Sequence, residues 1–257
     1  MSIITYPNIP LLQEDLIGSN KNYYSDKAQG FTLGRNSNVD DTLVDLWEGP
    51  TGSYVFPTTP IQMRVVSSSA NDAAAGTGAR TVIIFYLDTD YAAQTETITL
   101  NGTTPVNTVA TNILRINAFH VTSVGSGGVS VGNLSLTNTG STVTYGYITA
   151  GNNSSRQAIY TIPAGKTGYL THWQASSGAT TGTHFTRISV RSTSYLGALL
   201  SGVFLTVDEQ GTLNGGGSFN YPIPLKFPAM ADVKVSAISD SASANAYVMS
   251  ALFGWFE

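Results

Sequence analysis

Residues 80–102 read RTVIIFYLDTDYAAQTETITLNG. Two short runs in this stretch, Arg80–Leu87 and Thr95–Leu100, are rich in β-branched and aromatic residues, which is typical of strands. Asn101-Gly102 follows the second run, and this dipeptide is the strongest short-range signal for a tight hairpin that needs positive φ. The stretch therefore predicts antiparallel strands joined by turns.

The same pattern continues along most of the chain. About a dozen runs of this kind recur at spacings of about 8 to 15 residues, with no convincing amphipathic helix between them. No fixed-period repeat is present, which disfavours a propeller or a solenoid. We expect an all-β fold, an antiparallel β-sandwich or jelly-roll-like architecture, with further strands at 61–67, 113–124, 133–137, 142–149, 157–162, 167–175, 184–193, 202–207, 218–226, 232–238 and 247–256.

The last of these runs is apolar on both faces. Tyr247, Met249 and Phe253 share one parity of the strand, whereas Val248 and Leu252 share the other. A strand with two apolar faces is buried on both sides. We expect it to be central in a sheet or pressed against another subunit.

The chain divides into three parts by pattern. Residues 1–45 contain prolines, tyrosines and polar residues without two-residue alternation, so they predict an extended N-terminal arm. Residues 46–150 and 151–257 are each long enough for a β lobe, and the loop sequence GNNSS at 151–155 marks a boundary between them. One continuous sandwich over both segments is the alternative.

Charge is scarce in this chain. Asp, Glu, Lys and Arg make up 11% of its 257 residues, against about 25% in an average soluble domain. The net charge is −4 and the 12 Lys and Arg residues are scattered, so no basic field for nucleic acid is expected. Low charge also removes the usual material of active sites. The composition favours a protein that packs and assembles.

We also expect no signal peptide. The N-terminus, MSIITYP, has no basic stretch followed by an apolar region, and no run of about 20 apolar residues occurs. The absence of Cys excludes disulfides and thiolate metal sites. We expect no membrane partner, synthesis in a reducing host cytoplasm, and stability that comes from packing and from oligomerisation.

Each possible catalytic or metal-binding motif in the sequence is incomplete. The residues after Gly165-Lys166-Thr167 read as a strand, whereas a phosphate-binding loop needs a helix there. The three histidines lie in separate strands, and no serine sits in a Gly-x-Ser-x-Gly elbow. Asp88-Thr89-Asp90 lacks the rest of a calcium loop. We therefore expect no enzyme, and no catalytic, cofactor or metal site.

Aromatic residues are the better candidates for contact with a partner. Tyr and Trp carry much of the binding energy at protein interfaces, and several lie in or near the irregular N-terminal segment. The alternative, to which we give equal weight, is that these aromatic residues pack against their own lobe. The candidate partner-binding residues are Tyr6, Pro7, Tyr23, Tyr24, Trp47 and Tyr54.

Three stretches together resemble a group of tailed-bacteriophage virion structural proteins. They are VVSSSAND (65–72) through GTGAR (76–80) to TITLNG (97–102), IPAGKT (162–167), and PLKFP (224–228) through DVKV (232–235). The resemblance covers roughly residues 45–257 and leaves the arm unplaced. It implies a virion component, either a capsid cement or decoration protein or a tail-associated β-rich protein, and it supplies no catalytic residues.

The expectation from sequence is thus a non-enzymatic virion protein. We expect a capsid cement or decoration protein, anchored by its N-terminal arm to the major capsid protein or other virion proteins and assembled as a homotrimer. A tail or fibre component that binds a host surface glycan is the main alternative. A polysaccharide-cleaving enzyme, working with two carboxylates, is a third.

Overall fold

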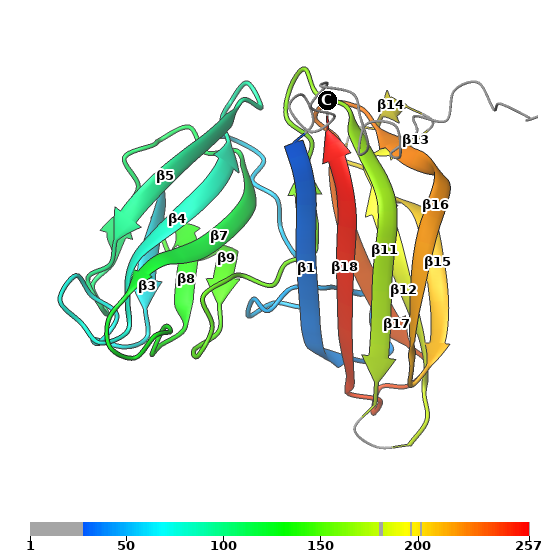
Figure 1. Ribbon diagram of the computed structural model, residues 1–257, viewed down its shortest axis with the longest axis horizontal. Coiled ribbons are helices and arrows are strands. Elements are labelled where there is room, and N and C mark those ends of the chain that lie inside the picture. Colours follow the sequence, from blue (N-terminus) through cyan, green and yellow to red (C-terminus); the bar gives the residue numbers. More distant parts are fainter. Residues whose placement is uncertain (1–27, 180–181, 196, 201, 257) are drawn as a thin grey trace, which may run out of the picture.

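A computed structural model describes residues 28–179, 182–195, 197–200 and 202–256, and in this part of the chain all regular structure is β (Figure 1). Every strand pairing is antiparallel, as the sequence predicts. The strands are β1 (Ala28–Val39), β2 (Val44–Asp45), β3 (Met63–Ser67), β4 (Ala79–Leu87), β5 (Ala93–Thr99), β6 (Val106–Asn107), β7 (Arg115–Val124), β8 (Leu134–Asn138), β9 (Thr144–Ile148), β10 (Ile159–Thr161), β11 (Gly168–Gly178), β12 (Phe185–Ser192), β13 (Ser194–Tyr195), β14 (Ala198–Leu199), β15 (Leu205–Leu213), β16 (Gly216–Phe227), β17 (Asp232–Ser239) and β18 (Ala246–Phe256).

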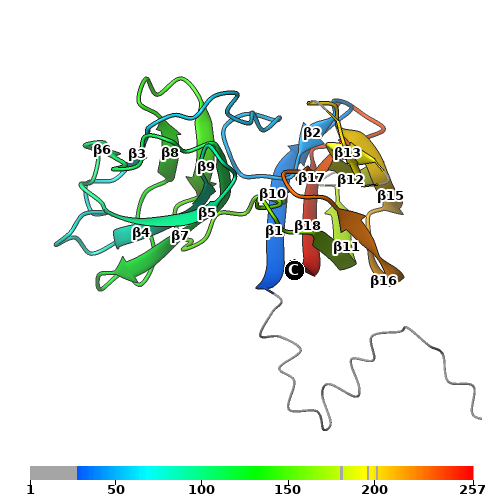
Figure 2. The same ribbon diagram turned by 90° about the horizontal axis from the view of Figure 1, so that it is seen from above.

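The strands form two sandwiches that lie side by side (Figures 1 and 2). In the first, which we call the inserted lobe, the sheet β6-β3-β8-β9 faces the sheet β5-β4-β7. Inward-facing residues of both sheets, such as Met63, Ile84, Phe119 and Leu136, are fully buried and form one apolar core. Alternation of buried and exposed residues along β3 and β4 explains why these segments form half-buried strands.

The second sandwich, which we call the terminal lobe, contains both ends of the described chain. Its sheet β1-β18-β11-β16 packs on the sheet β10-β17-β12-β15, and β2 pairs with β17. Trp173 and Val248 from the first sheet meet Ile188 and Val235 from the second in a fully buried core. The chain enters this lobe with β1 and β2, builds the inserted lobe with β3–β9, and returns at β10.

This connectivity corrects the expected arm of residues 1–45. Residues 28–39 are a long strand of the terminal lobe, paired with β18 from Ala28↔Phe256 to Val39↔Ala246, and Val44–Asp45 pair with β17. Gly34 makes this packing possible, because a Cβ there would lie 2.4 Å from the carbonyl oxygen of Leu46. The remainder of the expected arm, residues 1–27, lies outside the described residues.

The doubly apolar final strand is central, as predicted. β18 lies between β1 and β11, so both of its edges are hydrogen-bonded. Val248 and Leu252 are buried in the core on one face. On the other face Tyr247 is 36% exposed and Met249 is half-buried.

The predicted hairpin at Asn101-Gly102 is wrong, although the turn itself exists. The amide of Thr104 donates to the carbonyl oxygen of Asn101 at 3.1 Å, and φ of Gly102 is +61°. However, β5 before the turn pairs with β4, whereas β6 after it pairs with β3. The turn therefore carries the chain from one sheet of the inserted lobe to the other.

We expect Gly102→Val to destabilise the inserted lobe by about 1 kcal/mol or more. The valine would be strained at positive φ, and its Cβ would lie 3.0 Å from the Cα of Ala70. Thermal melting measures the effect. Gly140→Val is the matched control, since Gly140 is exposed and its nearest neighbour would be 3.7 Å away. Equal midpoints for the two variants would contradict the expectation.

Candidate functional site

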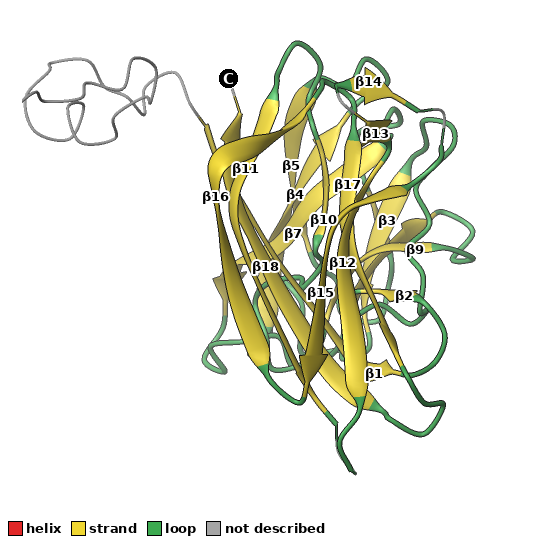
Figure 3. Cartoon of the chain, turned by 90° about the vertical axis from the view of Figure 1, so that its right-hand side faces the viewer, coloured by secondary structure: helices red, strands yellow, loops and turns green. Residues whose placement is uncertain are grey.

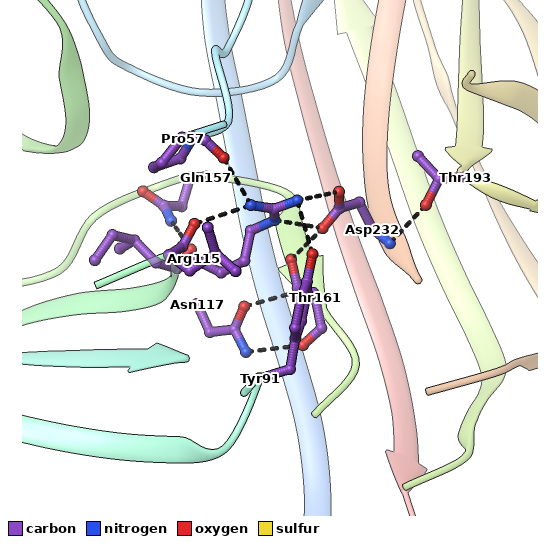
Figure 4. Close-up of polar contacts among 10 residues, drawn as sticks. Pro57, Tyr91, Arg115, Asn117, Gln157, Thr161, Thr193 and Asp232 are labelled. Atoms are coloured by element: carbon purple, nitrogen blue, oxygen red, sulfur yellow. Dashed lines mark hydrogen bonds and ion pairs between the residues drawn. The ribbon is translucent and has the colours of Figure 1, made fainter. Parts of the chain in front are cut away.

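The two lobes are joined by a buried ion pair (Figure 4). Arg115, the first residue of β7, donates from Nε to Oδ1 of Asp232 at 2.9 Å and from Nη2 to Oδ2 at 3.1 Å. Both side chains are about nine-tenths buried. Arg115 also donates to the carbonyl oxygens of Pro57 and Leu114. Because this bidentate geometry fixes orientation as well as distance, β7 of one lobe is held against β17 of the other.

Neighbouring side chains complete the polar network. The hydroxyl of Thr161 donates to Oδ1 of Asp232 at 2.6 Å, and the amide of Asp232 donates to Oγ1 of Thr193 at 2.9 Å. Asn117 of β7 binds the backbone of Thr161 twice, at 2.9 Å to its carbonyl oxygen and at 2.8 Å from its amide. Every oxygen of the Asp232 carboxylate thus has a donor, which is what makes a buried charge tolerable.

An aromatic cluster fills the junction beside this network. Trp47 and Tyr54 meet edge to face with ring centroids 5.2 Å apart, and Tyr54 meets Phe56 at 4.9 Å. The hydroxyl of Tyr54 donates to the carbonyl oxygen of Tyr145 in the inserted lobe at 3.1 Å, and burial raises its pKa. The guanidinium of Arg115 lies over the ring of Phe56, 5.2 Å from its centroid.

These contacts correct the expectation for two of the candidate partner-binding residues. Trp47 is 2% and Tyr54 is 4% exposed, so both pack within their own chain and present no surface to a partner. The alternative stated from the sequence, that these aromatic residues pack against their own chain, holds for Trp47 and Tyr54. Tyr6, Pro7, Tyr23 and Tyr24 lie outside the described residues, so their partner-binding role stays a prediction.

A second buried ion pair anchors the segment that leads into the junction. Nζ of Lys234 lies 2.9 Å from Oδ2 of Asp45, and the hydroxyl of Ser236 donates to Oδ1 at 2.7 Å. The amide of Tyr54 also donates to this carboxylate, at 2.8 Å. The loop between β2 and Tyr54 is therefore fixed to β17, and with it the position of the aromatic cluster.

Two cavities open between the lobes next to this locked junction. One, of about 400 Å³, is lined by β1, β7 and the connecting segment 152–157. The other, of about 420 Å³, is lined by β1, the loop 47–52, Asn133, Tyr147 of β9 and Thr149. Glu48 connects the linings of the two cavities, because it forms ion pairs with Arg35 of the second cavity and, at 3.4 Å, with Arg156 of the first. It also accepts a hydrogen bond from the hydroxyl of Thr149 at 2.9 Å.

Eight of the large apolar side chains that are exposed in the described residues belong to strands β12–β16 and their loops. β15 and β16 are the last strands of their two sheets, at the edge opposite β1 and β10, and Figure 3 views the molecule from this side. Ile223 is 84% exposed between two prolines, and Leu213 is 63% exposed. We call this set the apolar edge; it comprises Phe185, Tyr195, Leu199, Val203, Leu205, Leu213, Phe219 and Ile223.

The three histidines lie in different parts of the fold and do not contact one another. His172 contacts Asn220 at 2.7 Å, His184 pairs with Asp240 at 2.9 Å, and His120 belongs to the other lobe. Within the described ranges, no group of three His, Asp or Glu side chains is placed to hold a metal ion. In the same ranges, no helix is long and apolar enough to cross a membrane. The absence of an enzyme activity remains a prediction.

Comparison with known proteins adds little to this description. No family model and no curated protein matches the sequence. Among solved structures, the infectious bursal disease virus VP2 subviral particle aligns at 10% identity over 89% of this chain and 71% of that chain, with a TM-score of 0.19. The Gt strain of the same virus aligns over 90% and 72%, with a TM-score of 0.17. Likenesses with TM-scores this low carry no argument about fold or function.

Proposed function

We propose that this protein is a non-enzymatic structural component of a tailed-phage virion, and specifically a capsid cement or decoration protein. The observation that carries the proposal is the apolar edge. Monomeric soluble proteins rarely leave so many large apolar side chains exposed on adjoining strands, and such surfaces mark protein interfaces. The resemblance of residues 65–102, 162–167 and 224–235 to virion proteins supports the same class.

The body suits a structural role because its lobes are locked together. The buried Arg115–Asp232 pair and the aromatic cluster leave the junction few alternative arrangements. A rigid body can bridge neighbours in a shell without losing much conformational entropy on binding.

The topology supports a proposal of two separate contact surfaces. Residues 1–27 join the sandwich at Ala28 in β1, which is one edge of its sheet, whereas the apolar edge lies at the opposite side. In the proposed function, residues 1–27 anchor the protein to the major capsid protein or another virion protein. The apolar edge then joins copies of this chain in a homotrimer.

We expect the purified protein to form a stable trimer of the 27.1 kDa chain at micromolar concentration. Light scattering measures the mass of this oligomer. Leu213→Arg combined with Ile223→Arg should release monomers, because burying two unpaired cations in an apolar interface is costly. Val109→Arg, at an 89% exposed site on the inserted lobe, is the matched control and should leave the oligomer intact. A monomeric wild-type protein that stays monomeric in particles would contradict the proposal.

Truncation tests the anchor. Deleting residues 1–27 should leave the melting temperature nearly unchanged and abolish attachment to particles, because the prolines and polar residues of this segment show no strand alternation from which it could build a core. Deleting residues 1–45 should instead unfold the terminal lobe, because it removes β1 and β2 from their sheets. The measurements are thermal melting and co-sedimentation with particles stripped of the protein. If the variant without residues 1–27 attached as well as the full chain, another surface would bind the protein to the particle.

A further inference from the structure

An apolar cavity lies in the terminal lobe at the end where β1 begins and β18 finishes (Figure 1). It measures about 60 Å³, and its lining includes Ile162, Leu170, Val233 and Leu252, which also belong to the core of this lobe. These four side chains come from both sides of the sandwich. Because protein cores are close-packed, the core of the terminal lobe is incomplete at this end.

The strands around the cavity cannot fill it with their own side chains. Gly168 and Gly254 both line it, and Gly254 lies opposite another glycine, Gly30 of β1. A Cβ on Gly168 would lie 2.4 Å from Cδ1 of Ile162, and one on Gly254 would lie 2.1 Å from the carbonyl oxygen of Tyr169. A side chain that completes this end of the core must therefore come from another segment.

The size and chemistry of the cavity favour an aliphatic side chain. A cavity that holds benzene measures about 150 Å³, so a space of about 60 Å³ is too small for an aromatic ring. Apolar walls also offer a water molecule few of the polar partners that it needs. An aliphatic side chain would gain the dispersion contacts that the lining lacks at present.

The N-terminal segment of the chain starts beside this cavity. Ala28, the first residue of β1, pairs with Phe256, which is part of the lining. Ile17 precedes Ala28 by 11 residues, which span up to about 36–40 Å when they are extended. A tethered segment within reach has an effective concentration in the millimolar range, which favours the chain's own residues over those of a second copy.

Charge complementarity selects one stretch of this segment. Residues 11–17 read LLQEDLI, so the acidic pair Glu14-Asp15 is flanked by leucines. Lys166, just before β11, and Lys226, near the end of β16, are both exposed and lie next to lining residues. Among the described residues neither lysine forms an ion pair. Opposite charges on the two surfaces fix the position in which they meet.

We propose that residues 11–17 dock on this end of the terminal lobe of their own chain. One leucine of the pair Leu12 and Leu16 fills the cavity, and the acidic pair between them meets the two lysines. This contact goes beyond the proposed function and does not depend on it, because residues 1–10 remain available to a virion partner. Filling so small a cavity shifts the melting temperature by a few degrees at most, in agreement with the result expected for deletion of residues 1–27.

A spin label on the full-length protein tests this contact. The chain contains no Cys, so a nitroxide attached to Gln13→Cys occupies a single site. In a methyl-labelled protein the signals of Ile162, Leu170, Val233 and Leu252 should lose more than half of their intensity and recover it when the nitroxide is reduced. The same label on Ser126→Cys, an exposed site in the inserted lobe, is the matched control and should leave these signals unchanged.

Charge reversal tests which residues make the contact. Lys166→Glu combined with Lys226→Glu should restore at least half of the lost intensity, whereas Arg64→Glu in the inserted lobe should restore none. Adding Glu14→Lys and Asp15→Lys to the first variant should bring the intensity loss back. Such a rescue would identify Glu14 and Asp15, and not the acidic groups that follow Phe256, as the partners of the lysines.

Mixing two kinds of chain separates docking within one chain from exchange between copies. Spin-labelled chains without methyl labels are mixed with methyl-labelled chains that lack the nitroxide, and the cavity signals of the mixture should keep their intensity. An intensity loss in the mixture as large as that within one chain would make a second copy the source of the segment and overturn the proposal. Full intensity at the four cavity residues with Gln13→Cys, or charge reversal without effect, would overturn the assignment of residues 11–17.

Discussion

Replacing Arg115 by methionine should lower the free energy of unfolding by about 3–5 kcal/mol. The change removes the positive partner of Asp232, a residue that is 7% exposed, and leaves its carboxylate buried without a counter-charge. It also removes the hydrogen bonds that Arg115 makes to Pro57 and Leu114, so the lobes lose their main polar connection. Urea denaturation followed by circular dichroism measures the loss.

Arg187→Met is the matched control for this variant. Arg187 pairs with Glu209 at 3.8 Å, and both side chains are well exposed, so the loss should be below about 1 kcal/mol. Combining Arg115→Met with Asp232→Leu should recover part of the stability, because the buried charge is then removed as well. Equal effects of Arg115→Met and Arg187→Met would show that the ion pair does not hold the lobes.

Replacing Asp72 by alanine should destabilise the inserted lobe by more than about 3 kcal/mol. Asp72 is fully buried between β3 and β4, and its carboxylate accepts four hydrogen bonds. The donors are the hydroxyl of Ser67 at 2.6 Å and the amides of Ala79, Val131 and Gly132 at 2.8, 2.9 and 2.8 Å. The alanine variant leaves three backbone amides without their acceptor and disconnects two loops that this one side chain joins.

Asp88→Ala separates this effect from the general loss of an aspartate in a turn. Asp88 also accepts from two backbone amides, those of Asp90 and Ala92, but at a half-exposed turn where water can replace it. Its loss should cost about 1 kcal/mol or less. Hydrogen exchange of the β3, β4 and β8 amides should accelerate strongly in Asp72→Ala and little in Asp88→Ala. Equal exchange in the two variants would contradict the organising role of Asp72.

Most strands could be predicted from the sequence because their pattern is local. The predicted segments 80–87, 232–238 and 247–256 coincide closely with β4, β17 and β18, since each is rich in β-branched or aromatic residues. β1 escaped prediction because its sequence, AQGFTLGRNSNV, has no regular alternation. Its partner β18 lies at the other end of the chain, so pairing over that separation, and not local propensity, makes it a strand.

The candidate site was less predictable than the fold for the same reason. Arg115 and Asp232 are 117 residues apart, and nothing in either neighbourhood indicates the other. The available signal is a charged residue at or near the start of a predicted strand, Arg115 in 113–124 and Asp232 in 232–238, because such a residue needs a partner if it is buried. The sequence offers contact with a partner and packing on the chain's own lobe as alternatives for Trp47 and Tyr54. Their burial depends on the return of the chain at Ile159, which completes their cluster.

The most direct test of the proposed function is cryo-electron microscopy of the tailed-phage particles that, under this proposal, carry the chain. We expect a two-lobed body at regular positions on the outside of the head, with neighbouring copies in contact through the apolar edge and residues 1–27 against the shell. A particle whose head lacks this density, or one in which the protein occurs on the tail alone, would contradict the assignment as a capsid cement protein.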